Sequence, residues 1–159
     1  MSLKNYFFTT LEWKISEVAK SLFLSEDETK EYFRDGRRCS FLVERRIRDI
    51  IKGKLAPSEG SSYDLIDKDG NNWEVRSLTR GGIYFTNSRD IGSSRTFNEE
   101  GFLKKLDNIQ GYIVSDISHW PSVPVYKISS ENVLGWYNKN KLSSNTKISK
   151  NKFFELINE

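Results

Sequence analysis

The sequence predicts a mixed α/β (α+β) domain whose central mixed sheet of four to five strands is flanked by helices. Apolar residues recur at helical spacing up to about residue 54, alternate with period two between residues 63 and 78, and return to helical spacing after residue 98. A chain of 159 residues is long enough for one hydrophobic core and short for two. We therefore expect a core at residues 39–130, an N-terminal helical segment at residues 1–38 and a C-terminal helical tail at residues 131–159 that packs on the core.

The composition limits the classes of partner and metal. With 25 Lys and Arg against 22 Asp and Glu, the net charge is +3, which permits nucleic-acid binding without requiring it. Cys39 and His119 are the only thiol and imidazole, so a zinc site of cysteines and histidines is excluded and a bound metal must take oxygen ligands. The chain has no apolar run of about 18 residues and no signal-peptide pattern, so we expect a cytoplasmic protein with no membrane contact.

The N-terminal segment predicts two short helices between Leu11 and Phe33. Ser25, followed three residues later by Glu28, forms the pattern of a capping box that opens the second helix. Two short helices joined in this way resemble a helix-turn-helix motif, in which the second helix reads a DNA groove. Plain packing of both helices on the core is the other interpretation, and the sequence leaves both open.

A longer helix follows, capped by Ser40 and running to about Lys54. Two strands, Tyr63–Asp67 and Asn72–Leu78, are then joined by Lys68–Asn71 in a pattern typical of a β-hairpin. The remaining expected elements are strands at Ile83–Thr86, Gly111–Ser115 and Val123–Ile128, a helix at Asn98–Leu106, and tail helices at Glu131–Trp136 and Phe153–Ile157.

The hairpin register decides whether two acidic residues can act together. A three-residue loop with Gly70 in the left-handed conformation places Asp64 opposite Glu74 and gathers both, with Arg76, on the face that looks out of the sheet. Two carboxylates about 5 Å apart repel each other unless a cation lies between them, and oxygen ligands suit Mg²⁺ or Mn²⁺. Ordinary solvated strand residues are the alternative reading of this pair.

Glu44 is a third acid of interest because it lies on or beside the apolar stripe of the long helix. A carboxylate at such a position is costly unless it is paired. Its partner is either Arg48, four residues on, or a metal ion shared with the hairpin if the helix packs against it.

A helix with Glu44, a strand with Asp64, a hairpin, and Glu74-Val75-Arg76 on the next strand resemble the PD-(D/E)XK nuclease superfamily, in particular its restriction-endonuclease-like members. The resemblance covers Ser40 to Ser115. It implies that Asp64, Glu74 and the backbone carbonyl of Val75 hold Mg²⁺, with Mn²⁺ as a substitute, and that Glu44 lies at the rim of the site. Arg76 stands where the family has Lys, and Arg cannot act as a base.

The resemblance implies Mg²⁺-dependent hydrolysis of phosphodiester bonds in double-stranded DNA, in its most concrete form by a type II restriction endonuclease acting as a homodimer. Five arginines around the hairpin are the expected DNA contacts: Arg45, Arg48, Arg80, Arg89 and Arg95. The replacement of Lys by Arg76 favours an alternative, a DNA-binding or regulatory module of the same fold that is catalytically impaired. A protein interaction domain that uses the aromatic-rich faces is a further alternative.

Overall fold

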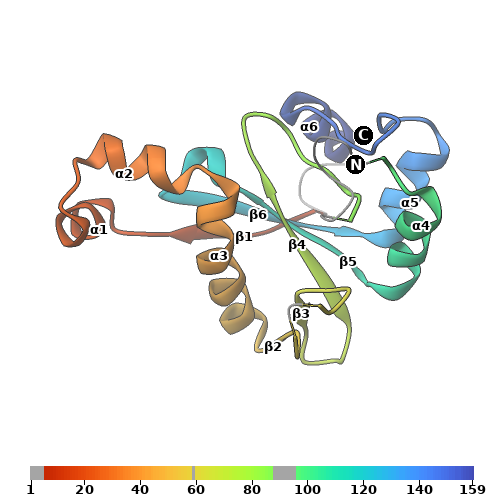
Figure 1. Ribbon diagram of the computed structural model, residues 1–159, viewed down its shortest axis with the longest axis horizontal. Coiled ribbons are helices and arrows are strands. Elements are labelled where there is room, and N and C mark those ends of the chain that lie inside the picture. The colour runs from red at the N-terminus through yellow and green to blue at the C-terminus, as the bar shows by residue number, and fades with distance from the viewer. Residues whose placement is uncertain (1–5, 59, 88–95) are drawn as a thin grey trace.

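The computed structural model describes residues 6–58, 60–87 and 96–159, and within them the chain forms a mixed α+β fold around one six-stranded sheet (Figure 1). The order of strands in the sheet is β1-β6-β5-β4-β3-β2. Their bounds are β1 Phe7–Glu12, β2 Lys54–Leu55, β3 Leu65–Ile66, β4 Asn72–Leu78, β5 Gly111–Asp116 and β6 Ser122–Ser129. The expected number of four to five strands is wrong by one or two, because β1 and β2 were not foreseen.

Helices cover both faces of the sheet. Their bounds are α1 Ile15–Leu22, α2 Glu26–Phe33, α3 Gly36–Ile51, α4 Glu99–Asn108, α5 Ser130–Asn138 and α6 Lys150–Asn158, with a 3₁₀ turn, η3, at Ile117–His119. One core cluster joins α3 to one face of β4, β5 and β6, and a second joins α4, α5 and α6 to the opposite face. In Figure 1, α1 and α2 project at one end of the molecule while α4, α5 and α6 gather at the other.

The N-terminal segment begins with a strand and not with a helix. β1 pairs antiparallel with β6, with Leu11 opposite Val123, and Leu11 is fully buried. The prediction of a purely helical segment at residues 1–38 is therefore wrong for β1, whose pairing partner lies more than a hundred residues away in the sequence. The capping box is confirmed: the amide of Glu28 donates to Ser25 Oγ at 3.1 Å, and the amide of Ser25 donates to Glu28 Oε1 at 3.0 Å.

The long helix α3 starts five residues earlier than expected. Its N-cap is Asp35, whose Oδ1 accepts a hydrogen bond from the amide of Arg37 at 2.9 Å, so Ser40 lies inside the helix and not at its cap. The helix ends at Lys52, which adopts a left-handed conformation with φ of 54°. β2 follows at once, where a loop was expected, because Lys54 pairs with Ile66 and Leu55 with Leu65.

The hairpin has the expected loop and register. Leu65 is opposite Trp73, the amide of Asp67 donates to the carbonyl of Asn71 at 2.9 Å, and Gly70 has φ of +86°. The side chain of Asp67 holds the loop closed, since Oδ1 accepts from the amide of Asn71 and Oδ2 from the indole of Trp73, each at 2.9 Å.

Ile83–Thr86 is not a strand, although it was expected to be one. Ile83 makes only an isolated bridge to Ile148. The next strand after β4 is β5, which lies parallel to it, and α4 provides the crossover that parallel neighbours need. None of the helices in the described part of the chain combines the length and apolar character needed to cross a membrane.

Candidate functional site

Asp64 lies just beyond the end of the β3–β4 ladder. The last pair of the ladder is Leu65 with Trp73, and the amide of Asp64 donates to the carbonyl of Trp73 at 2.9 Å. Its carboxylate reaches across to β4, where Oδ2 accepts a hydrogen bond from the amide of Val75 at 2.8 Å. The predicted register therefore holds as far as Leu65, and Asp64 contacts the residue next to Glu74 without forming a ladder pair with Glu74 itself.

Glu74 is buried inside the protein, with 6% of its surface exposed. Its Oε1 lies 3.1 Å from Arg76 Nη2, and its Oε2 lies 3.0 Å from Lys105 Nζ. Burial raises the pKa of Glu74, while Arg76 and Lys105 oppose that rise. The prediction that Glu74 looks out of the sheet toward solvent is wrong in this structure.

The position of β4 in the sheet explains this burial. β5 pairs with β4 from Trp73 to Leu78, β3 pairs only with Asn72 and Trp73, and helices pack on both faces of the sheet. Trp73 and Val75 pack on the α3 side, which directs Glu74 to the side of α4. A buried carboxylate requires a partner of opposite charge, and Glu74 has two.

Lys105 is a buried charged side chain at the candidate site that the sequence reasoning did not find. It lies on the buried stripe of α4, between Phe102 and Leu106, and is only 7% exposed. Burial lowers its pKa, and the negative charge of Glu74 raises it in part. A lysine among the apolar residues of an amphipathic helix is the same kind of signal that marked Glu44, so the pattern could have been found.

Arg76 is directed into the protein. Its Nη2 donates to the carbonyl of Thr86 at 2.6 Å in addition to pairing with Glu74, and its Nε is buried without a hydrogen-bond partner among the described residues. Nη2 is thus engaged by Glu74 and the backbone, while Arg76 also lines a hollow of about 510 Å³ beside the N-terminal end of α3.

Glu44 and Asp64 line one cleft of about 340 Å³ that α3 forms with the segment before β3. Glu44 makes an ion pair with Arg45 at 3.9 Å, whereas Arg48 pairs with Asp49 at 2.8 Å, so the expected partner Arg48 is wrong. We call this hollow the acidic cleft, and its lining residues are Ser40, Phe41, Glu44, Arg45, Leu55, Ala56, Ser58, Tyr63 and Asp64.

The pKa of Glu44 is shifted by the charges of the other two acids, Asp64 and Glu74. This pKa is raised to about 7, chiefly by burial and next by the charge of Asp64, with a smaller contribution from Glu74 and an opposing one from Arg45. The charge of Asp64 also raises the pKa of Glu74. The three carboxylates come from α3, the start of the hairpin and β4, and each pair interacts electrostatically.

The carboxylates of Glu44, Asp64 and Glu74 meet the requirements of a divalent cation only in part. Carboxylate oxygens are the right donors for Mg²⁺, which is usually held by one or two carboxylates completed by waters and substrate phosphates. Across residues 6–58, 60–87 and 96–159, however, no three His, Cys, Asp or Glu side chains form a group that could hold a metal ion. Asp64 and Glu74 fit Mg²⁺ by type and number, and the amide of Val75, not its carbonyl, is the group that contacts Asp64.

The three described arginines among the five expected to contact DNA, Arg45, Arg48 and Arg80, do not line one common hollow. Arg45 lines the acidic cleft and lies with its guanidinium carbon 3.3 Å from the centre of the Phe41 ring, while Arg80 lines a different cavity. Arg89 and Arg95 lie outside the described residues.

No family model matches the sequence, and no curated protein matches it. The chemistry of the chain's own residues is therefore the basis for inferring a function.

Proposed function

We propose that the protein is a Mg²⁺-dependent endonuclease of double-stranded DNA with a restriction-endonuclease-like core, most concretely a type II restriction enzyme. The observation that carries this proposal is that Glu44 and Asp64 line one cleft beside the strand that bears Glu74, with the pKa of Glu44 raised to about 7 by burial and by the charges of Asp64 and Glu74. Mutually repelling carboxylates at a cleft are the arrangement that a divalent cation stabilises.

The order of elements supports the same reading. From α3 the chain continues through the β3–β4 hairpin to α4 and β5, which is the part of the expected order of helix, hairpin, third strand, helix and strand that supports the resemblance to PD-(D/E)XK nucleases. The strands differ from those expected, since β2 precedes the hairpin and Ile83–Thr86 is not a strand.

The residues of this chain would divide the work as follows. Asp64 and Glu74 would hold the cation, and the chemistry that the cation supplies is a bound water of lowered pKa and neutralisation of phosphate charge. Lys105 places an amine of lowered pKa against Glu74, which supplies the proton-transfer capacity that Arg76 lacks. Arg76 holds the carboxylate of Glu74 in place through Oε1.

To bind a cation, Glu74 must release one of its present partners. Both of its oxygens are engaged by cationic side chains, so a divalent cation must compete with Arg76 or Lys105 for them. Metal affinity should therefore be low without DNA and should rise when a phosphate adds its own oxygens.

A plasmid-nicking assay tests the proposal. We expect the protein to convert supercoiled plasmid to nicked or linear forms in Mg²⁺ or Mn²⁺ and not in EDTA, and we expect Asp64→Asn to lower the rate about a hundredfold or more. Asp107→Asn, an exposed change on α4, is the matched control and should keep full activity. Cleavage that survives in EDTA, or in Asp64→Asn, contradicts the proposal.

A catalytically impaired DNA-binding module is the second candidate, and the double neutralisation of the buried Glu74 favours it. In that case the protein should bind duplex DNA with an affinity that falls as salt rises, yet break no strand in either metal. Filter binding beside the nicking assay separates the two functions.

Symmetric cutting of both strands needs two copies of the site, which a two-fold homodimer would supply. Sedimentation velocity with and without duplex DNA tests this part of the proposal. If the protein is a monomer under both conditions, the expected activity is nicking, in which one strand of the duplex is cut at a time.

A further inference from the structure

A second hollow lies on the α2 side of the sheet, apart from the acidic cleft. It has a volume of about 550 Å³ and is formed by α2, the turn after β4 and η3. We call it the basic cavity, and its lining residues are Asp27, Lys30, Glu31, Arg34, Thr79, Arg80, Gly81 and Ser118. None of them lines the acidic cleft.

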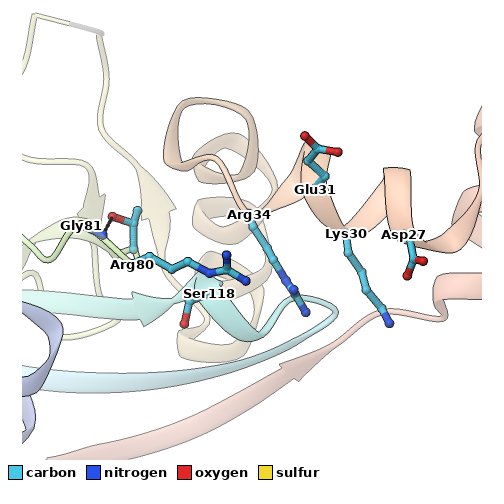
Figure 2. A pocket seen from close by; sticks show the side chains of 8 residues that line it. Asp27, Lys30, Glu31, Arg34, Arg80, Gly81 and Ser118 are labelled. Atoms are coloured by element: carbon cyan, nitrogen blue, oxygen red, sulfur yellow. Dashed lines mark hydrogen bonds between the residues drawn. The ribbon is translucent and has the colours of Figure 1, made fainter.

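Three cations face this cavity from two elements. Figure 2 shows Lys30 and Arg34 leaving α2 on the same side, as their spacing of four residues requires, and Arg80 extending toward them from the turn after β4. Two carboxylates also line the cavity: Asp27 leaves α2 on the same side as Lys30, and Glu31 leaves it on the opposite side. Within the described parts of the chain, none of the three cations takes part in an ion pair.

The base of the cavity is fixed by a hydrogen-bonded cluster. Arg34 Nε donates to the carbonyl of Trp120 at 3.1 Å, which anchors the side chain while its terminal nitrogens remain for another partner. The hydroxyl of Ser118 donates to the buried Asp116 at 2.6 Å, and Lys150 Nζ lies 3.3 Å from Asp116 Oδ2. The charge of Asp116 behind the cavity is thus paired with Lys150, and the lining itself holds three cations against the two carboxylates Asp27 and Glu31.

A third hollow connects the two sites. It has a volume of about 510 Å³, shares Thr79 and Gly81 with the basic cavity, and shares Ser40 with the acidic cleft. Arg37 and Lys147 also line it. The three hollows therefore adjoin along one surface that passes the N-terminal end of α3 and is edged by basic side chains.

We propose that the basic cavity binds a phosphate group of the nucleic acid whose cleavage is assigned to the acidic cleft. The identity of the nucleic acid as DNA rests on the proposed function, whereas the phosphate chemistry rests on Lys30, Arg34 and Arg80. Arginine forks and a lysine on a fixed base suit phosphate oxygens. On this reading α2 grips the backbone and does not read base edges, which resolves the role of the N-terminal helices in favour of positioning.

Salt-dependent binding of a short fluorescein-labelled duplex, followed by anisotropy in EDTA, tests the proposal. Each phosphate contact releases counterions, so Arg80→Gln and Lys30→Gln should each lower the slope of log K against log salt by about one, and the double variant by about two. Lys104→Gln, which removes one exposed charge from α4, is the matched control and should keep the wild-type slope. Two duplexes of unrelated sequence should be affected equally.

Duplexes ending in 5′-phosphate or 5′-hydroxyl identify the source of the phosphate. Equal losses in the variants indicate an internal backbone phosphate, and losses confined to the phosphorylated duplex indicate a terminal one. Slopes of Arg80→Gln and Lys30→Gln that match the Lys104→Gln control overturn the proposal, as does a wild type that binds no duplex at low salt.

Because EDTA prevents metal-dependent cleavage, the result is independent of catalysis. If the variants lower the slope of log K against log salt but the wild type never nicks plasmid, the phosphate site is supported and the nuclease activity is contradicted. If the wild type nicks plasmid but the variants keep the wild-type slope, the nuclease activity is supported and the phosphate site is contradicted.

Discussion

Replacing Glu44 by Gln should stabilise the protein at alkaline pH. The raised pKa means that, between pH 4.5 and about 7, the folded state holds a proton on Glu44 that the unfolded state has released. Stability must then fall as the pH rises through that window, since ionised Glu44 lies in the acidic cleft near Asp64. Gln keeps the size of the side chain and has no charge to develop, so the variant escapes this loss.

The size of the effect follows from the same pKa. The difference between 4.5 and about 7, at about 1.4 kcal/mol for each unit of pKa, corresponds to at most about 3.5 kcal/mol. The side chain of Glu44 retains 26% exposure, and solvent screening reduces the expected gain to about 1 to 2 kcal/mol. Below pH 4.5 the two proteins should have nearly equal stability, because Glu44 is protonated in both states of the wild type.

Urea denaturation followed by tryptophan fluorescence measures this directly, since the chain has four Trp. Measured in EDTA, the advantage of Glu44→Gln over wild type should grow by about 1 to 2 kcal/mol from pH 5 to pH 8.5. Glu155→Gln, an exposed change on α6, is the control and should show no such growth. A constant difference across this range would refute the raised pKa of Glu44.

Two further pairs of substitutions test the buried charges and the backbone. Glu74→Gln leaves the cations Arg76 and Lys105 without their counter-charge and should lower the free energy of unfolding by about 3 to 5 kcal/mol. Lys105→Met leaves the ion pair between Glu74 and Arg76 in place and should lower it less. The midpoints of urea unfolding show which variant is less stable. Gly111→Ala should destabilise by about 1 to 3 kcal/mol, because its new Cβ would lie 2.2 Å from a backbone carbonyl of β6. Gly135→Ala in α5 meets nothing within 4 Å and should raise stability by about 0.5 to 1 kcal/mol, so thermal melts of the two glycine variants should shift in opposite directions.

Local patterns in the sequence specified the elements whose partners are close along the chain. The capping box of Ser25 and Glu28, and the hairpin closed by Gly70, are confirmed because the interacting groups are only a few residues apart. The fold class, and strands at the positions of β5 and β6, also follow from the sequence, since long apolar runs indicate burial wherever they pack.

Elements that depend on distant partners could not be obtained in this way. β1 exists because β6 offers it an edge, and β2 because two residues after α3 meet the edge of β3. Ile83–Thr86 has strand-like composition and yet finds no ladder. Composition favours an extended backbone at such positions, and the presence or absence of a hydrogen-bonding edge decides the outcome.

In the candidate site, too, some features follow from residues close in the sequence and others depend on distant partners. The sequence by itself determined that Asp64 would lie near the strand bearing Glu74, because hairpin register is set by the turn between them. Only the tertiary structure decided that Glu74 is buried and paired with Lys105, thirty-one positions further along the chain, and that Glu44 shares a cleft with Asp64. The physical reason is that burial and ion pairing depend on which layers pack on a strand, and packing between layers is a property of the whole fold.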